Sequence, residues 1–212
     1  YLGIGKGAWL KEVGIQQPKP IEAIRETIEL VQQLLEGKRQ SYEGTFFQLP
    51  SKAHLRFTIP ERKLPVLIGG WGPRILSLAG QIADMAKVGG CANPECVPIF
   101  RNYLIKGAQQ VGRDPSSIKL IFGAVTVVDY NADVAEQLAR RNVAMYVGIT
   151  AKLDPTFSTT SQEIAAIQTA LDKGDEEAAA NALSKETLKR FSVFGTPHEI
   201  TIHLEKLFDA GI

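Results

Sequence analysis

The chain has 212 residues, and its 24 Lys and Arg against 23 Asp and Glu give a net charge of +1. This balance argues against a nucleic-acid binder and against a polybasic membrane-surface protein. Hydrophobic residues make up 44% of the chain, which excludes wholesale disorder. There is no run of roughly 18 apolar residues and no signal peptide, and two cysteines make no disulfide framework. We therefore expect a soluble, cytoplasmic globular protein.

The first third of the sequence predicts a strand, a helix and an excursion. Residues 1–4 form a short apolar run that leads into a glycine-rich segment. A helix begins at Pro20, and its apolar residues recur at helical spacing until Gly37. Residues 38–63 are rich in aromatic residues and predict a small hairpin or an extended excursion rather than core strands.

The middle of the sequence has the strongest strand signals. Residues 65–68 are continuously apolar, which is typical of a strand buried on both faces, and further strands are predicted at 85–88 and 118–128. Helices follow the first two of these strands. One has Pro73 in its first turn, and the other is predicted to be capped by Asn93.

The last third is predicted to be helical. A helix covers residues 133–146, and residues 150–194 form an alanine-rich insert of two or three short helices. A capping box at Thr196–Glu199 opens the last helix, which Gly211 stops.

The order of these elements predicts an α/β fold with a parallel sheet and right-handed crossovers. A doubly wound sheet and a (β/α)8 barrel both fit this order. Only four core strands are recognised, whereas a barrel takes about 250 residues. Four units cannot close and would leave two bare sheet edges. The chain begins with Tyr1 inside a predicted strand and ends at Ile212 after a helix. We expect residues 1–212 to form a single domain that is an incomplete barrel and inactive alone.

The clearest candidate site is the turn between the strand at 65–68 and its helix. It consists of Gly69, Gly70, Trp71, Gly72 and Pro73. Glycines let the backbone approach a ligand, and the free amides of a helix start attract an anion, usually phosphate. Arg74 would add a charge-assisted hydrogen bond. The alternative is a tight turn that only needs positive φ, since the turn is neither a Walker loop nor a G-x-G-x-x-G motif.

Two other segments contain candidate contacts. The segment after the first strand contributes Gly5, Lys6, Gly7 and Lys11. It forms either a plain turn or a wall against which a flat ring lies, with its lysines as anion contacts. Lys87 lies in an apolar strand, where a charge is costly unless it is paired or aimed into a polar cleft. It either points into a site at the end of the strand, where we count it among the cofactor contacts, or pairs with Asp84 at the surface.

The sequence contains no recognisable catalytic set. Cys91 and Cys96 have no His between them, which argues against a metal site, and the three His residues are scattered. We expect His198 and His203 on a helix surface. With no Ser-His-Asp arrangement and no paired carboxylates, the chemistry is expected to come from a cofactor.

Two segments resemble a known family: PVLIGGWGPRILSLAGQIAD at 65–84 and KVGGCANPE at 87–95. They are similar to the luciferase-like superfamily of flavin- and deazaflavin-dependent oxidoreductases. The nearest likeness is to coenzyme F420-dependent enzymes of the methylenetetrahydromethanopterin reductase type. The segments LGIGKGAWL, IRETIELVQQLLEGKRQSYEGTFFQL and FGTPHEITIHLEKLFDAGI resemble further parts of the same family. The resemblance implies a (β/α)8 TIM barrel of the bacterial-luciferase type. This chain would hold about units four to seven with a helical insert, and would lack the first three units and the final strand.

The resemblance also implies a cofactor site. Residues Gly69 to Pro73 would hold the cofactor phosphate, and Gly5, Lys6 and Gly7 would line its ring or tail. The implied cofactor is F420, with FMN as the alternative because the same loop binds either phosphate. Ala8 stands where some relatives have an acidic residue, so no catalytic residue is assigned. Replacing Gly70 or Gly72 by a β-branched residue is expected to weaken cofactor binding with less effect on folding.

The implied activity is hydride transfer between reduced F420 and a small C=N or C=O substrate, such as a methylene-pterin. The implied assembly is a homodimer that binds a small molecule, and neither nucleic acid nor a membrane is an expected partner. Two alternatives remain. One is an FMN-dependent monooxygenase of the same fold. The other is a non-catalytic, cofactor-free relative that only dimerises or binds a partner.

Overall fold

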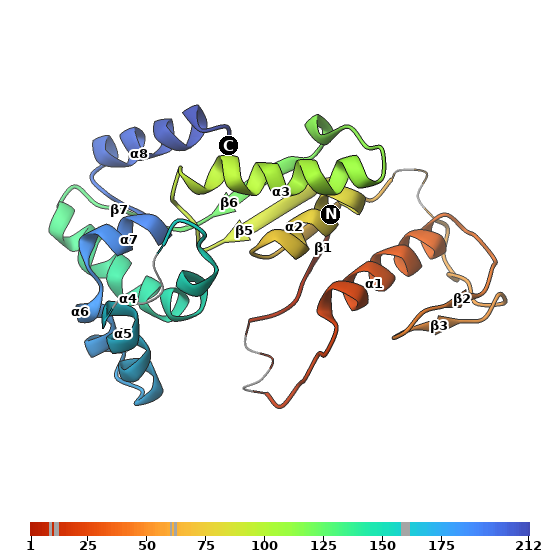
Figure 1. The fold of residues 1–212 in the computed structure, drawn as a ribbon, viewed down its shortest axis with the longest axis horizontal. Helices are drawn as coiled ribbons and strands as arrows, with labels where there is room; N and C mark the ends of the chain where they lie inside the picture. Colours follow the sequence, from red (N-terminus) through yellow and green to blue (C-terminus); the bar gives the residue numbers. More distant parts are fainter. Residues whose placement is uncertain (9, 11–12, 60, 62, 158–161) are drawn as a thin grey trace.

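Four parallel strands form the centre of the fold, in the order β1–β4–β5–β6 (Figure 1). Their bounds are β1 Leu2–Gly5, β4 Val66–Gly69, β5 Met85–Gly89 and β6 Lys119–Gly123. The computed structural model describes residues 1–8, 10, 13–59, 61, 63–157 and 162–212. Every neighbouring pair in this sheet is parallel, which confirms the expected sheet type.

Three helices accompany this sheet: α1 Pro20–Leu35, α2 Pro73–Ile82 and α3 Cys96–Gln110. The predicted starts of α1 at Pro20 and α2 at Pro73 are confirmed. Helices α2 and α3 pack backbone against backbone, because a Cβ at Gly80 or Gly107 would collide with a main-chain carbonyl of the facing helix. This close contact fixes α2 relative to the strands, and so fixes the turn that leads into it.

The predicted start of α3 is wrong by two residues. The helix begins at Cys96, and Asn93 lies in the preceding turn, where its Oδ1 accepts a hydrogen bond from the Glu95 amide (3.2 Å). The Asn93 side chain is buried and donates to Oγ1 of Thr156 (2.8 Å). This long-range bond ties the loop after β5 to the segment that follows α4, and the local sequence pattern gives no sign of it.

The predicted single strand at 118–128 is also wrong. The chain forms two strands there, β6 and β7 (Val125–Val128), which belong to different sheets. Strand β7 pairs in parallel with β8 (Ser192–Gly195), which the sequence pattern does not predict. All four β8 residues are buried, so β8 shows no alternation of apolar and polar residues. It also follows directly on helix α7 (Lys185–Phe191), which leaves no break in the sequence to mark its start.

The remaining elements agree with the predicted organisation. Strands β2 (Tyr42–Glu43) and β3 (Gln48–Leu49) form an antiparallel hairpin outside the central sheet. The other helices are α4 Ala132–Thr150, α5 Gln162–Asp172, α6 Glu176–Ala182 and α8 Pro197–Asp209. The capping box between Thr196 and Glu199 is confirmed. The boundaries 38–63 and 150–194, and the single domain 1–212, stay predictions.

Two apolar cores meet near the end of β4. One lies between the four-stranded sheet and helices α2 and α3, and the other between α4 and helices α5 to α7. Trp71 packs against both cores, so the turn after β4 is held by two parts of the fold at once. In the described parts of the chain, no helix is long and apolar enough to cross a membrane.

Candidate functional site

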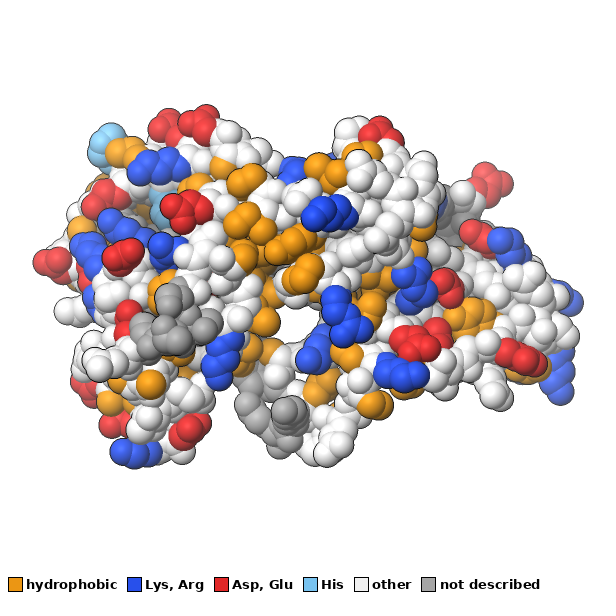
Figure 2. All heavy atoms as spheres, in the orientation of Figure 1, with side chains coloured by type: hydrophobic (Ala, Val, Ile, Leu, Met, Phe, Trp, Pro, Cys, Tyr) orange, Lys and Arg blue, Asp and Glu red, His pale blue; other side chains and the backbone are white. Residues whose placement is uncertain are grey.

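A cavity of about 850 Å³ lies at the carboxyl ends of the four central strands; we call it the strand-end cavity. Figure 2 shows the molecule hollowed in this region, with hydrophobic and cationic side chains beside the hollow. Each of the four strands ends in a glycine that lines it: Gly5, Gly69, Gly89 and Gly123. Because glycine has no side chain, a flat ligand can approach the backbone here closely.

The turn after β4 forms one wall of this cavity. The Gly70 amide donates to the Lys87 carbonyl (3.0 Å), and the Trp71 indole Nε1 donates to the Gly89 carbonyl (2.6 Å). Gly72 has a φ of 90° and is the N-cap of α2, where it supplies no side-chain cap. The turn therefore does need positive φ, and it also leaves the first amides of α2 uncapped by a side chain. Such amides favour an anion.

The charge of the strand-end cavity is one-sided. Three cationic side chains line it, those of Lys6, Arg74 and Lys87, and the described lining contains no Asp or Glu. Most of the other lining side chains are apolar, among them Ile21, Ile75, Ile149, Leu153 and Phe191. A cavity of this kind suits a ligand with an apolar body and at least one negative group. Lys11, the other expected anion contact, lies outside the described residues.

Lys87 points into the cavity and does not pair with Asp84. The Asp84 carboxylate instead binds the ammonium of Lys63 (2.9 Å) and the Val66 amide (2.8 Å). The side chain of Lys87 extends across Gly123, where a Cβ would lie 2.7 Å from the Lys87 Cε. Of the two interpretations of Lys87, the surface pair is wrong.

Most of the predicted site residues come together in this cavity. Its lining includes Gly5, Lys6, Gly7, Gly69, Gly70, Trp71 and Lys87. Gly72 and Pro73 shape the start of α2 without lining the cavity. The expectation that a β-branched residue at Gly70 weakens cofactor binding with less effect on folding stays a prediction. The structure adds a packing cost to it, because a Cβ at Gly70 would lie 2.8 Å from Cγ1 of Ile75, which would have to shift.

Sequence reasoning missed several lining residues. They are Gly89, Gly123, Tyr146, Thr150 and Phe191. Gly89 directly follows the predicted strand at 85–88, which is a signal that would have identified it, whereas Gly123 lies inside the predicted strand at 118–128 and gives no such signal. The other three come from α4 and α7, which reach the cavity only through tertiary packing.

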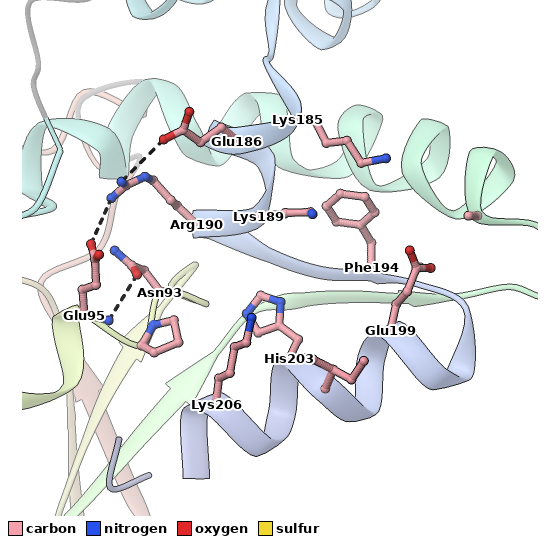
Figure 3. Close-up of a pocket in the computed structure, with 14 residues that line it drawn as sticks. Asn93, Glu95, Lys185, Glu186, Lys189, Arg190, Phe194, Glu199, His203 and Lys206 are labelled. Atoms are coloured by element: carbon pink, nitrogen blue, oxygen red, sulfur yellow. Dashed lines mark hydrogen bonds and ion pairs between the residues drawn. The ribbon is translucent and has the colours of Figure 1, made fainter. Parts of the chain in front are cut away.

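A second, smaller pocket of about 380 Å³ lies between the start of α3, helix α7, strand β8 and helix α8; we call it the charged pocket (Figure 3). Figure 3 shows Arg190 between Glu95 and Glu186. The Arg190 guanidinium nitrogens lie 3.8 Å from Oε2 of Glu95 and 3.9 Å from Oε1 of Glu186. Lys185 pairs with Glu136 at 2.7 Å. His203 is half-buried and its Nε2 contacts the Ala92 carbonyl (2.7 Å), so only His198 is exposed as expected. Most of the charges here are balanced within the protein.

The two cysteines are buried thiols. The Cys96 thiol donates to Oδ1 of Asp154 (3.4 Å), and its pKa is raised far above the usual range by its contact with Cys91 and by burial. A thiol held in this way is a poor nucleophile. Within the described ranges, no three His, Cys, Asp or Glu residues are placed to hold a metal ion.

Comparison with known proteins gives consistent matches. A family model described as luciferase-like monooxygenase matches residues 1–212. A 5,10-methylenetetrahydromethanopterin reductase from Archaeoglobus fulgidus is 28% identical over 218 residues, covering 100% of this chain and 64% of that protein. The one from Methanolobus tindarius is 26% identical with the same coverage of both proteins.

A solved structure gives the same match. The coenzyme F420 dependent tetrahydromethanopterin reductase from Methanopyrus kandleri superposes with a TM-score of 0.85 at 25% identity, covering 99% of this chain and 65% of that one. An F420-dependent secondary alcohol dehydrogenase shares the fold with a TM-score of 0.75 at 23% identity. The chain thus spans somewhat less than two thirds of the length of these relatives.

Proposed function

Because this chain belongs to the luciferase-like monooxygenase family and has its α/β TIM-barrel-type fold, we propose that the protein is a coenzyme F420-dependent oxidoreductase. The observation that carries the proposal is the strand-end cavity, which has a glycine floor, the uncapped start of α2 with Arg74 beside it, and no Asp or Glu in its described lining. The names of the relatives support F420 as the cofactor, since the reductase and dehydrogenase matches carry it in their names.

The residues present fit such a cofactor. The amides at the start of α2, with Arg74, would hold a phosphate, and the strand-end glycine Gly89 leaves the space of its missing side chain to a flat ring. At Gly89 this space is open, because a Cβ built there meets no atom within 4 Å. The bound deazaflavin would supply hydride-transfer chemistry.

The chain's own part would be to bind, orient and exclude water. Ile149, Leu153 and Phe191 give the cavity apolar walls, which shield a reacting pair from solvent. The described lining has no carboxylate or imidazole, so the protein contributes positioning rather than an acid–base pair there. We propose a small C=N or C=O compound of the methylene-pterin class as substrate, and a cytoplasmic homodimer as the working form.

The test is an anaerobic titration of the protein with F420 and with FMN, followed by cofactor fluorescence. We expect tight binding of F420 and weaker binding of FMN. Tight FMN binding with no affinity for F420 would instead establish the second candidate, an FMN-dependent monooxygenase, which the same uncapped helix start also suits. If neither cofactor bound and no substrate turned over, the cofactor-free relative would replace both.

A further inference from the structure

Lys87 occupies a central place in the sheet. Strand β5 lies between β4 and β6, and Lys87 pairs in register with Gly69 on one side and Ile121 on the other. Gly69 in turn pairs with Gly5 of β1. The positions of β4 and β1 that are in register with Lys87 are therefore both glycines and place no side chain beside it. Its side chain extends over Gly123 of β6, with Nζ 3.5 Å from the position of a Cβ there. The ammonium therefore lies on the β6 side of the cavity, away from the turn after β4.

The charge of Lys87 has no partner among the described residues. In the part of the chain that the structure describes, no ion pair or hydrogen bond joins Lys87 to another side chain, and the nearby Asp84 is bound to Lys63. The side chain is exposed to the cavity, where water solvates it. A ligand that fills the cavity removes this water, and burying an unpaired ammonium is costly. A ligand that brings a negative group to this place avoids that cost.

We infer that Lys87 forms an anion subsite of the strand-end cavity, separate from the turn after β4, and that it binds a carboxylate or phosphate group of the substrate. The assignment to substrate rests on the proposed function, in which the cofactor phosphate lies at the start of α2. A phosphate held there gives no counter-charge to Lys87, which lies on the β6 side of the cavity. The substrate class is thus a small carbonyl or imine compound that also carries an anionic group.

The experiment compares wild-type protein with Lys87→Met, Lys87→Arg and the control Lys119→Met. Lys119 is an exposed lysine at the start of β6, outside the cavity. Inorganic phosphate is titrated by calorimetry into the F420 complex and into the cofactor-free protein, and the F420 affinity of each variant is measured separately. We expect Lys87→Met to weaken phosphate binding to the F420 complex by about tenfold or more, as loss of a charge-assisted contact does. Lys87→Arg should retain most of it.

The outcomes separate the two proposals. F420 affinity should stay within about twofold in Lys87→Met, and a loss of about tenfold would assign the anion to the cofactor and overturn the substrate assignment. Phosphate binding equal in wild type and Lys87→Met, or absent from both, would overturn the subsite. If wild type bound neither F420 nor FMN, the proposed function would fail. The phosphate titration of the cofactor-free protein would then still decide whether Lys87 binds an anion.

Discussion

The strand-end cavity and the charged pocket differ in how their charges are balanced. Both are lined by several Lys and Arg side chains, but the charged pocket also contains Glu95, Glu186 and Glu199. Its arginine lies between two of these carboxylates, and Glu199 accepts hydrogen bonds from Thr196 in the capping box. Among the residues that the structure describes, the strand-end cavity offers its cations no carboxylate. An unbalanced charge, rather than a number of charges, is what indicates a ligand.

The two sites also differ in what forms their surface. Backbone at the four strand-end glycines forms the floor of the strand-end cavity, whereas the charged pocket is lined mainly by long polar side chains. Backbone is rigid and gives a ligand the same shape every time, while long side chains must be ordered at an entropic cost. This difference favours the strand-end cavity as the binding site, and three experiments test it.

The largest expected effect comes from filling the floor of the strand-end cavity. At Gly89 a Cβ meets nothing within 4 Å, so Gly89→Val should fold normally and place its methyl groups in the space of the ligand. We expect a loss of cofactor affinity of roughly a hundredfold or more, measured by fluorescence titration. The melting temperature should remain that of the wild type.

The matched control is Gly3→Val. Gly3 lies on β1 outside the cavity, and a Cβ there also meets nothing within 4 Å. This variant should bind cofactor as well as wild type does. Equal affinity in wild type and Gly89→Val would show that the ligand does not approach the strand ends, and would remove the main difference between the two sites.

The part of this comparison that could be predicted from sequence is the part built from local signals. The continuous apolar run of β4, the glycines after it and Pro73 at the start of α2 are adjacent in the chain, and the structure confirms the strand and the helix start. The binding role of the glycines stays a prediction. The predictions of a single strand at 118–128 and of a helix cap at Asn93 are wrong, because contacts between residues far apart in the sequence decide both features. Strand β7 leaves the first sheet to pair with β8, and Asn93 bonds to Thr156.

The roles of Gly123 and Asp84 also depend on contacts that the sequence alone does not reveal. Gly123 matters because β6 lies beside β5 in a register that brings Lys87 across it, and no sequence pattern gives that register. Asp84 was the only partner near Lys87 in sequence, yet Lys63 binds it from a segment 21 residues away. The interpretation of Lys87 therefore had to stay open until its neighbours in space were known.

The second prediction removes one positive charge from each site. Arg74→Gln takes a cation from the strand-end cavity and should weaken cofactor binding about tenfold, an effect that shrinks at high salt. Lys206→Gln makes the same charge change in the charged pocket and should leave cofactor affinity unchanged. Affinities are measured by fluorescence titration at low and high ionic strength. An equal loss in both variants would mean that only the overall charge of the protein matters.

The smallest effect is expected on stability, from an ion-pair network that supports the charged pocket. Glu136 is 17% exposed and binds Lys185 at 2.7 Å and Arg140 at 2.6 Å. The hydrogen bond from Lys185, followed by that from Arg140, lowers the pKa of Glu136 below its ordinary value of 4.5. Glu136→Gln should reduce the free energy of unfolding by about 1 kcal/mol at pH 7, with no change in cofactor affinity. Urea unfolding of wild type and Glu136→Gln at several pH values measures this difference in the free energy of unfolding.

The pH dependence gives this prediction its sign. Because the folded state holds the pKa of Glu136 below that of the unfolded chain, its contribution is fully present above pH 4.5 and is lost as the pH falls through the folded pKa. The stability gap between wild type and Glu136→Gln should therefore close on acidification. Glu205→Gln, a change at an exposed acid of α8, should show no gap at any pH. A gap for Glu136→Gln that persisted unchanged in acid would mean that Glu136 stabilises the fold by packing rather than by its charge. Ion pairs would then contribute little to the structure of the charged pocket, and the proposed difference in charge balance between the two sites would be weakened.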